Sequence, residues 1–160
     1  MVVAGDSIAA RVAEIGSELP TVSSPSANYV PFVVTGNLLY ISGQLPMKDG
    51  AAAYVGRAGD GATVEDGYAS ARLCGLNVVA QVAAAVGDRL SRVKRCVNVT
   101  VFVHAVPDFT EHPRIANGAS DLFVAVFGDA GRHSRAAVGM GSLPRGVLTE
   151  VQAIFEIVPA

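Results

Sequence analysis

The stretch VKRCVNVTVFVH, residues 93–104, constrains the fold more than any other part of the chain. The side chains of a strand alternate between its two faces, so these residues divide by parity. One face carries valine alone from residue 97 onward, which predicts that it lies beneath helices. The other face has no charged residue between 96 and 102, which is unusual for a surface in bulk water. We therefore expect a sheet with helices on one face and a partner on the other.

The rest of the chain supplies the helices and strands of such a sheet. We expect a leading helix that Asp6 or Ser7 caps and Pro20 ends, with an apolar stripe of Ile8, Val12, Ile15 and Leu19. A hairpin turn is expected at Gly36-Asn37, and a long helix should begin at Val64 and stop at Gly87. The remaining expected elements are a helix at 113–126 and strands at 30–34, 38–42, 53–57, 135–140 and 149–158. This order predicts the α+β class, a mixed β-sheet with two helices packed on one face and an extra N-terminal helix.

Length and charge bound the kind of protein. A chain of 160 residues fits one domain, residues 1–160, with a helix and linker at 1–26 and the core at 27–158. Charged residues make up 16%, below the roughly 25% typical of soluble domains, which again favours a covered outer face. The net charge of −2 and the lack of a basic stripe argue against nucleic acid as a partner. No membrane span is expected, because no uninterrupted apolar run approaches the roughly 20 residues that a bilayer requires.

Neither a metal nor a cofactor is expected. The three histidines lack ligand spacing, and no glycine motif for nucleotide binding is present. Cys74 and Cys96 are expected as small buried residues in a reducing compartment. The first residues lack a basic region followed by an apolar run, so we expect no secretory signal and a cytoplasmic location.

One charged side chain, Arg135, stands at the start of an expected strand among small and apolar residues. A guanidinium keeps its charge inside a protein, so it requires an anionic partner, water or a ligand. Glu150 lies near the start of the next strand, and both side chains could face one cleft if the two strands pair. Two interpretations stay open. The pair is either a structural salt bridge or a fork for a substrate carboxylate beside a group that holds water.

Three stretches together resemble the RidA/YjgF family of imine/enamine deaminases, also labelled endoribonuclease L-PSP. They are NYVPFVVTGNLLYISGQLP at 28–46, VNVTVFVHAVPDF at 97–109 and SRAAVGMGSLPRGVLTEVQAIFEI at 134–157. The resemblance runs from about residue 27 to residue 158. The leading helix and the longer middle resemble a divergent, longer branch of the family.

The resemblance implies a fold similar to bacterial chorismate mutase and a homotrimer with a cleft between neighbouring subunits. It implies hydrolysis of reactive 2-imino and 2-enamino acids, such as 2-aminoacrylate, to 2-keto acids and ammonia. By position, Arg135 would bind the substrate carboxylate, and Glu150 would hold the water or the leaving ammonia. Gly43, Tyr29 and Asn117 match positions that contact substrate.

Some positions depart from the family pattern. Ala137 stands where typical members carry a cysteine or hydroxyl residue, and Arg132 and His133 lie beside the expected cleft entrance. The altered pocket favours a second hypothesis, a trimer that binds small carboxylates without catalysis. A third is the endoribonuclease or translation-inhibitor role given to some relatives. The negative net charge and the lack of a histidine pair for acid–base cleavage oppose it.

Overall fold

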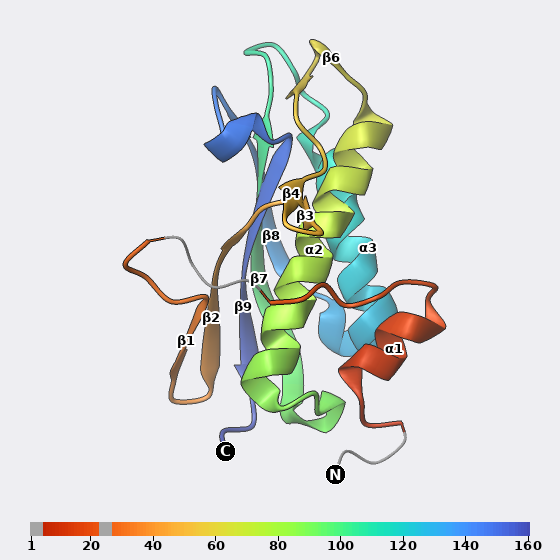
Figure 1. Ribbon diagram of the computed structural model, residues 1–160, viewed down its shortest axis with the longest axis vertical. Coiled ribbons are helices and arrows are strands. Elements are labelled where there is room, and N and C mark those ends of the chain that lie inside the picture. Colours follow the sequence, from red (N-terminus) through yellow and green to blue (C-terminus); the bar gives the residue numbers. More distant parts are fainter. Residues whose placement is uncertain (1–4, 23–26) are drawn as a thin grey trace.

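A five-stranded sheet with two long helices on one face forms the body of the molecule (Figure 1). The computed structural model describes residues 5–22 and 27–160. The strand order is β1-β2-β9-β7-β8, which confirms the expected mixed sheet. The strands are β1 (Phe32–Thr35), β2 (Leu38–Gln44), β7 (Val93–His104), β8 (Ser134–Met140) and β9 (Thr149–Ile157). The helices that cover the sheet are α2 (Val64–Val86) and α3 (His112–Phe127).

Strand β7 has hydrogen-bonded neighbours on both edges, antiparallel β9 on one and parallel β8 on the other. Val99, Val101 and Val103 are completely buried beneath the helices, as the alternation predicts. Strict parity fails near the start of the strand, because the pairing with β9 shifts register between Val93 and Arg95 and again between Cys96 and Asn98. Cys96 is therefore buried with the valines, although its parity placed it on the opposite face.

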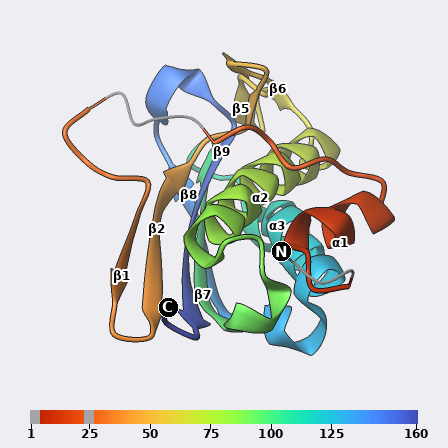
Figure 2. The same ribbon diagram turned by 60° about the horizontal axis from the view of Figure 1, so that its bottom comes forward.

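Helix α2 is positioned by signals at both of its ends. Thr63 and Asp66 form a reciprocal capping box at its start, and Gly87 takes the left-handed conformation that ends it, with φ of 66°. By length and composition α2 would be able to cross a membrane, but 61% of its most apolar stretch is buried within the fold. It is the core helix, and it packs directly against α3 and the sheet (Figure 2).

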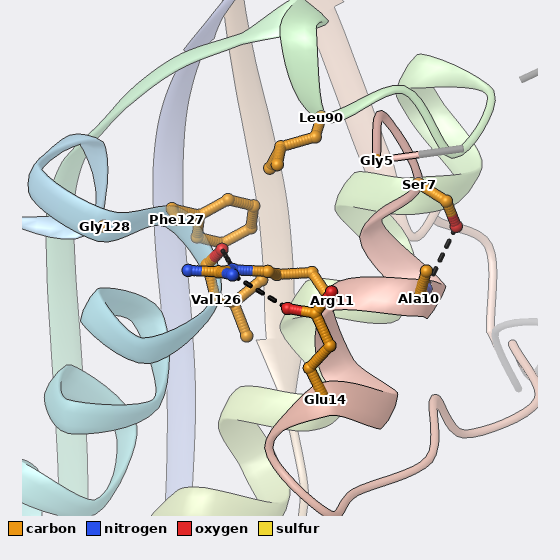
Figure 3. A pocket seen from close by; sticks show the side chains of 9 residues that line it. All are labelled: Gly5, Ser7, Ala10, Arg11, Glu14, Leu90, Val126, Phe127 and Gly128. Carbon is orange, nitrogen blue, oxygen red and sulfur yellow. Dashed lines mark hydrogen bonds and ion pairs between the residues drawn. The ribbon is translucent and has the colours of Figure 1, made fainter. Parts of the chain in front are cut away.

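The leading helix α1 (Ile8–Glu14) closes one end of the helical layer and is shorter than its apolar stripe predicts. Ser7 caps it and also donates to the Asp88 carboxylate at 2.6 Å, which joins α1 to the turn after α2. Ile8 and Val12 are fully buried. The helix ends before Gly16, whose φ of 72° suits glycine, and not at Pro20. Figure 3 shows this end of the molecule, where Arg11 reaches both Glu14 and the carbonyl of Val126.

Of two further segments, one follows expectation and the other differs from it. The Gly36-Asn37 turn forms the β1–β2 hairpin as predicted, with Gly36 at φ of 59°. The single strand expected at 53–57 is absent from the described residues, and four two-residue strands occupy this region. They are β3 (Met47–Lys48), β4 (Ala51–Ala52), β5 (Arg57–Ala58) and β6 (Gly61–Ala62). The many glycines of this segment favour short bridges over a continuous strand.

Among the residues that the structure describes, no helix covers the sheet face opposite α2 and α3, called the open face below (Figures 1 and 2). The register places Asn98, Thr100 and Phe102 of β7 on this face, beside their partners on β8 and β9. Exposed apolar side chains lie on it as well, among them Tyr40 at 42% and Val138 at 37% exposed. A largely uncharged sheet face of this kind is suited to contact with another protein surface.

Gly118 lets α2 and α3 approach closely, and we predict that Gly118→Ala destabilises the protein. An added Cβ would overlap the carbonyl oxygen of Tyr68, which belongs to the α2 backbone and cannot turn aside. Alanine normally favours a helix over glycine, but overpacking against backbone should dominate and cost about 1–3 kcal/mol. Thermal unfolding measures this as a loss of about 2–4 °C in Tm for each kcal/mol.

The control for this substitution is Gly141→Ala, because nothing lies within 4 Å of an added Cβ at that position. Its Tm should stay close to that of the unchanged protein. Equal melting temperatures for the two variants would show that α3 can shift to accept the methyl group.

Candidate functional site

Arg135 lies on the edge strand β8, on the same side of the sheet as the helices. Its register partner is Val99, which is buried beneath them. Its side chain reaches α3, where Nη1 donates to Asn117 Oδ1 at 2.8 Å and to Ser120 Oγ at 3.1 Å. Nη2 makes a longer contact of 3.5 Å with the carbonyl of Pro113. Neutral acceptors on α3 thus hold one end of the guanidinium.

Two N–H donors of the Arg135 guanidinium remain available to bind a ligand. The group has five N–H donors, and the contacts above use both of Nη1 and one of Nη2. Within residues 5–22 and 27–160, the donors of Nε and the second Nη2 hydrogen have no partner. Nε and Nη2 share an edge of the planar group, which matches the two oxygens of a carboxylate. Arg135 is exposed, so this fork is accessible from solvent.

A hydrogen-bonded chain supports Ser120 from behind. His133 Nδ1 lies 2.6 Å from the carbonyl oxygen of Gly131, and its Nε2 lies 2.9 Å from Ser120 Oγ. Since a carbonyl oxygen can only accept, Nδ1 carries the hydrogen and Nε2 accepts from the Ser120 hydroxyl in the neutral ring. Burial lowers the pKa of His133, and the positive charge of Arg135 lowers it further.

His133 therefore points into the fold and not into a cleft entrance. Its ring packs edge-on against Phe123, with centroids 5.8 Å apart. Arg132 is exposed and pairs with Asp129 at 3.4 Å.

Glu150 lies on β9 and faces the opposite side of the sheet. Its register partner is Phe102, on the open face. The carboxylate is half-buried against the backbone of Gly43, where any added Cβ would overlap Oε1. A register shift between Ile41 and Gln44 in β2 brings Gly43 to this position. Burial raises the pKa of Glu150.

Arg135 and Glu150 do not share a cleft within one chain, contrary to the expectation that their strands pair. β7 lies between β8 and β9, and the two side chains leave the sheet on opposite faces. The described part of the chain also contains no Arg135–Glu150 ion pair, so the structural salt bridge is not formed within the chain. The reason is the topology of the sheet. β8 and β9 follow each other along the chain but do not pair, because each of them pairs with β7, and local spacing does not reveal this long-range choice.

The predicted site residues fall into separate groups. Asn117 joins Arg135, and we call these two with Ser120 and His133 the arginine half. Gly43 joins Glu150, and we call these two the glutamate half. Tyr29 precedes β1, the strand at the sheet edge opposite β8, and its side chain is 53% exposed. The two halves thus occupy different faces of one molecule.

A cavity of about 180 Å³ beneath α1 is lined by residues of α1, the end of α3 and Leu90 (Figure 3), and it contains none of the predicted site residues. Within the described ranges, no three His, Cys, Asp or Glu side chains gather as metal ligands would.

Sequence reasoning missed Ser120 of the arginine half, whereas Asn117 was matched by resemblance and His133 was expected beside the cleft entrance. Ser120 and Asn117 are three positions apart on α3, and so lie on one helical face. That spacing was a usable signal for Ser120. Sequence reasoning also missed the buried hydrogen bond between Ser70 Oγ and Thr149 Oγ1, which are 2.6 Å apart. This bond joins α2 to the start of β9, at the residue before Glu150. Nothing in the local sequence joins those two residues.

Comparison with known proteins places the chain in a family. The model of the family described as "YjgF/chorismate mutase-like, putative endoribonuclease" matches residues 9–157. Protein TCP17 of Trypanosoma cruzi is 48% identical over 157 residues, which cover 98% of each chain.

Solved structures agree with this match. The crystal structure of a "putative endoribonuclease" from Shewanella oneidensis MR-1 is 37% identical, with a TM-score of 0.90 over 95% of this chain and 100% of that one. The structure of E. coli TdcF with bound serine is 27% identical, with a TM-score of 0.59 over 88% of this chain and 98% of that one. The sheet, its two covering helices and the nearly full-length match together show that the protein belongs to the YjgF/chorismate mutase-like family.

Proposed function

We propose that the protein hydrolyses reactive 2-imino and 2-enamino acids to 2-keto acids and ammonia, at sites shared between the subunits of a homotrimer. The observation that carries the proposal is the free edge of the Arg135 guanidinium, held in place by α3 and open to solvent. A planar fork of this kind binds a carboxylate through two parallel hydrogen bonds.

The reaction requires little beyond placement of the reactants. An enamine first takes a proton at C3 and becomes the iminium, whose C2 is already electrophilic. Water adds to C2 and loses a proton, which leaves a hydroxyl group and an amine on C2. The nitrogen then takes a proton and leaves as ammonia, while the hydroxyl loses its remaining proton and the C2–O bond becomes the carbonyl of the keto acid. Holding the acid and the water in contact supplies most of the acceleration.

In this proposal the two halves have different tasks. Arg135 binds the carboxylate and fixes the orientation of C2. Glu150 holds the water and passes a proton between it and the leaving nitrogen. Burial raises the pKa of Glu150, which makes this carboxyl a better proton carrier near neutral pH than an exposed glutamate.

A second copy of the chain would complete the site. The arginine half lies on the β8 edge, and the glutamate half lies on the open face. A closed ring that repeats one contact would place the β8 edge of each subunit against the open face of the next. The low charge of that face supports the arrangement. The serine bound in TdcF is a small molecule with a carboxylate, which supports the proposed kind of ligand.

Arg135→Ala should remove most of the acceleration of keto-acid formation from 2-aminoacrylate generated in the assay. Losing a charge-assisted bidentate contact costs about 1.5–3 kcal/mol, which corresponds to roughly ten- to hundredfold in kcat/KM. Arg114→Ala is the matched control, because Arg114 is an exposed arginine like Arg135, but it lies on α3 and its guanidinium pairs with Glu111. Equal rates for the unchanged protein and Arg135→Ala would contradict the proposal.

The same preparations distinguish the other functions. Pyruvate binding that depends on Arg135, without any rate acceleration, would support a carboxylate-binding trimer instead. Cleavage of labelled RNA that Arg135→Ala abolishes would support an endoribonuclease, the activity named for the Shewanella oneidensis relative.

Mixed trimers test whether the site is shared. Arg135→Ala and Glu150→Ala subunits should each be inactive alone. Co-refolding them should restore a complete site wherever the arginine half of a Glu150→Ala subunit meets the glutamate half of an Arg135→Ala subunit. Random mixing at equal amounts makes about one quarter of the sites intact in a cyclic assembly. Activity that stays at the level of the separate variants would show that each subunit carries its own complete site.

Glu150→Gln should stabilise the protein more at pH 7 than at pH 4. The pKa of this carboxyl is higher in the folded protein than in the unfolded chain, so its protonated form favours folding. This stabilisation is fully present below the unfolded-state pKa and is lost as the pH rises through the folded-state pKa. Removing the charge therefore raises Tm at neutral pH and changes little in acid. Glu18→Gln, at an exposed position, is the control and should show no such pH dependence. A Tm change that is larger in acid would contradict burial as the cause.

A further inference from the structure

We propose that His133, acting through Ser120, is the positioning residue for Arg135. This rests on the proposed function in one respect only, namely that Arg135 binds a carboxylate. The arrangement itself stands on the contacts of Ser120, which lies between the imidazole and the guanidinium.

The orientation of the Ser120 hydroxyl carries the argument. Its oxygen lies 2.9 Å from His133 Nε2 and 3.1 Å from Arg135 Nη1. Both protons of Arg135 Nη1 are donors and Nε2 is an acceptor in the neutral ring, so the hydroxyl donates to the histidine and accepts from the arginine. Without an acceptor at Nε2, the hydroxyl hydrogen is free to turn toward Nη1, which would displace the guanidinium.

The ring that sets this orientation is itself fixed by the core. Gly131, whose carbonyl accepts from Nδ1, is buried so closely against the backbone of Phe123 that an added Cβ would overlap it. The Phe123 ring contacts the imidazole edge-on and is fully buried. A rigid series of contacts thus runs from the core through His133 and Ser120 to Arg135.

The charges around the ring favour its neutral form. Arg135 is the cation that acts on it from β8. Asp129 and Arg132, in the turn before the strand, pair with each other and are 99% and 71% exposed. On α3 the ring meets Ser120 and Phe123, neither of which carries a charge. Burial and, to a smaller extent, Arg135 disfavour protonation and outweigh the hydrogen bond to Gly131, which favours it. The pKa of His133 therefore lies below its usual value, and the ring accepts from Ser120 at neutral pH.

The first measurement requires no substrate. Nitrogen-15 NMR of the full chain at pH 7.5 should show His133 with its hydrogen on Nδ1 and an unprotonated Nε2. The Nη1 hydrogens of Arg135 should give separate, slowly rotating signals. A hydrogen on Nε2, or a charged ring at this pH, would overturn the proposal.

Variants then separate positioning from structure. His133→Phe keeps a ring of similar size without the acceptor, whereas His133→Gln offers a neutral oxygen near the position of Nε2. Ser120→Ala removes the link. We expect the slow Arg135 signals to be lost in Ser120→Ala and His133→Phe and kept in His133→Gln. Retention of these signals in His133→Phe would overturn the proposal even if pyruvate binding or activity were lost.

Calorimetry with pyruvate measures the effect on the fork. Ser120→Ala and His133→Phe should weaken binding by about three- to tenfold, the effect of one net hydrogen bond, and His133→Gln should restore it. The double variant Ser120→Ala/His133→Phe should be no weaker than Ser120→Ala, because the histidine acts through the serine. Additive losses would overturn the proposal.

The two proposals fail in distinguishable ways. Pyruvate binding that requires Arg135 but ignores Ser120 and His133 would overturn the positioning role and leave the proposed function in place. No binding or activity in the unchanged protein, together with the expected tautomer and Arg135 signals, would overturn the proposed function while the His133–Ser120–Arg135 arrangement stands.

Discussion

The pairing of β7 on both of its edges determines where the chemistry of this chain lies. With β8 on one side and β9 on the other, the strand that carries Arg135 and the strand that carries Glu150 cannot be neighbours. The alternation of the strands then sends the two side chains to opposite faces. One chain consequently presents the arginine half and the glutamate half on separate faces, which is why the proposed function requires a second copy related by a symmetry axis.

The position of Arg135 follows from the cost of burying a charge. A permanently charged group in the interior would require an equally buried anion, and such pairs gain little stability after desolvation. At the edge strand, the guanidinium satisfies part of its donors with the neutral oxygens of Asn117 and Ser120 and leaves the remainder to solvent. Neutral partners leave the positive charge uncompensated, which suits a site for an anion.

Local signals in the sequence determined much of the fold, since the Gly36-Asn37 turn, the stop of α2 at Gly87 and the buried valines of β7 all follow from near neighbours. Two features of the fold could not be predicted from the sequence. The register shift that buries Cys96 depends on how β7 pairs with β9, and the separation of Arg135 from Glu150 depends on which strands adjoin. Both are long-range choices that parity and spacing along one segment do not encode.

Asn117 was matched by resemblance and does contact Arg135, whereas His133 was placed at a cleft entrance although its ring is turned toward Phe123.

The location of α1 has a practical consequence. It is attached to the turn after α2 through Ser7 and Asp88, on the outer side of the helical layer and away from the open face (Figures 1 and 2). An affinity label fused ahead of this helix would therefore project from the back of the sheet. Two populations carrying different labels could then be captured in succession. This would isolate mixed assemblies of defined stoichiometry and leave the open face, the proposed contact surface, unobstructed.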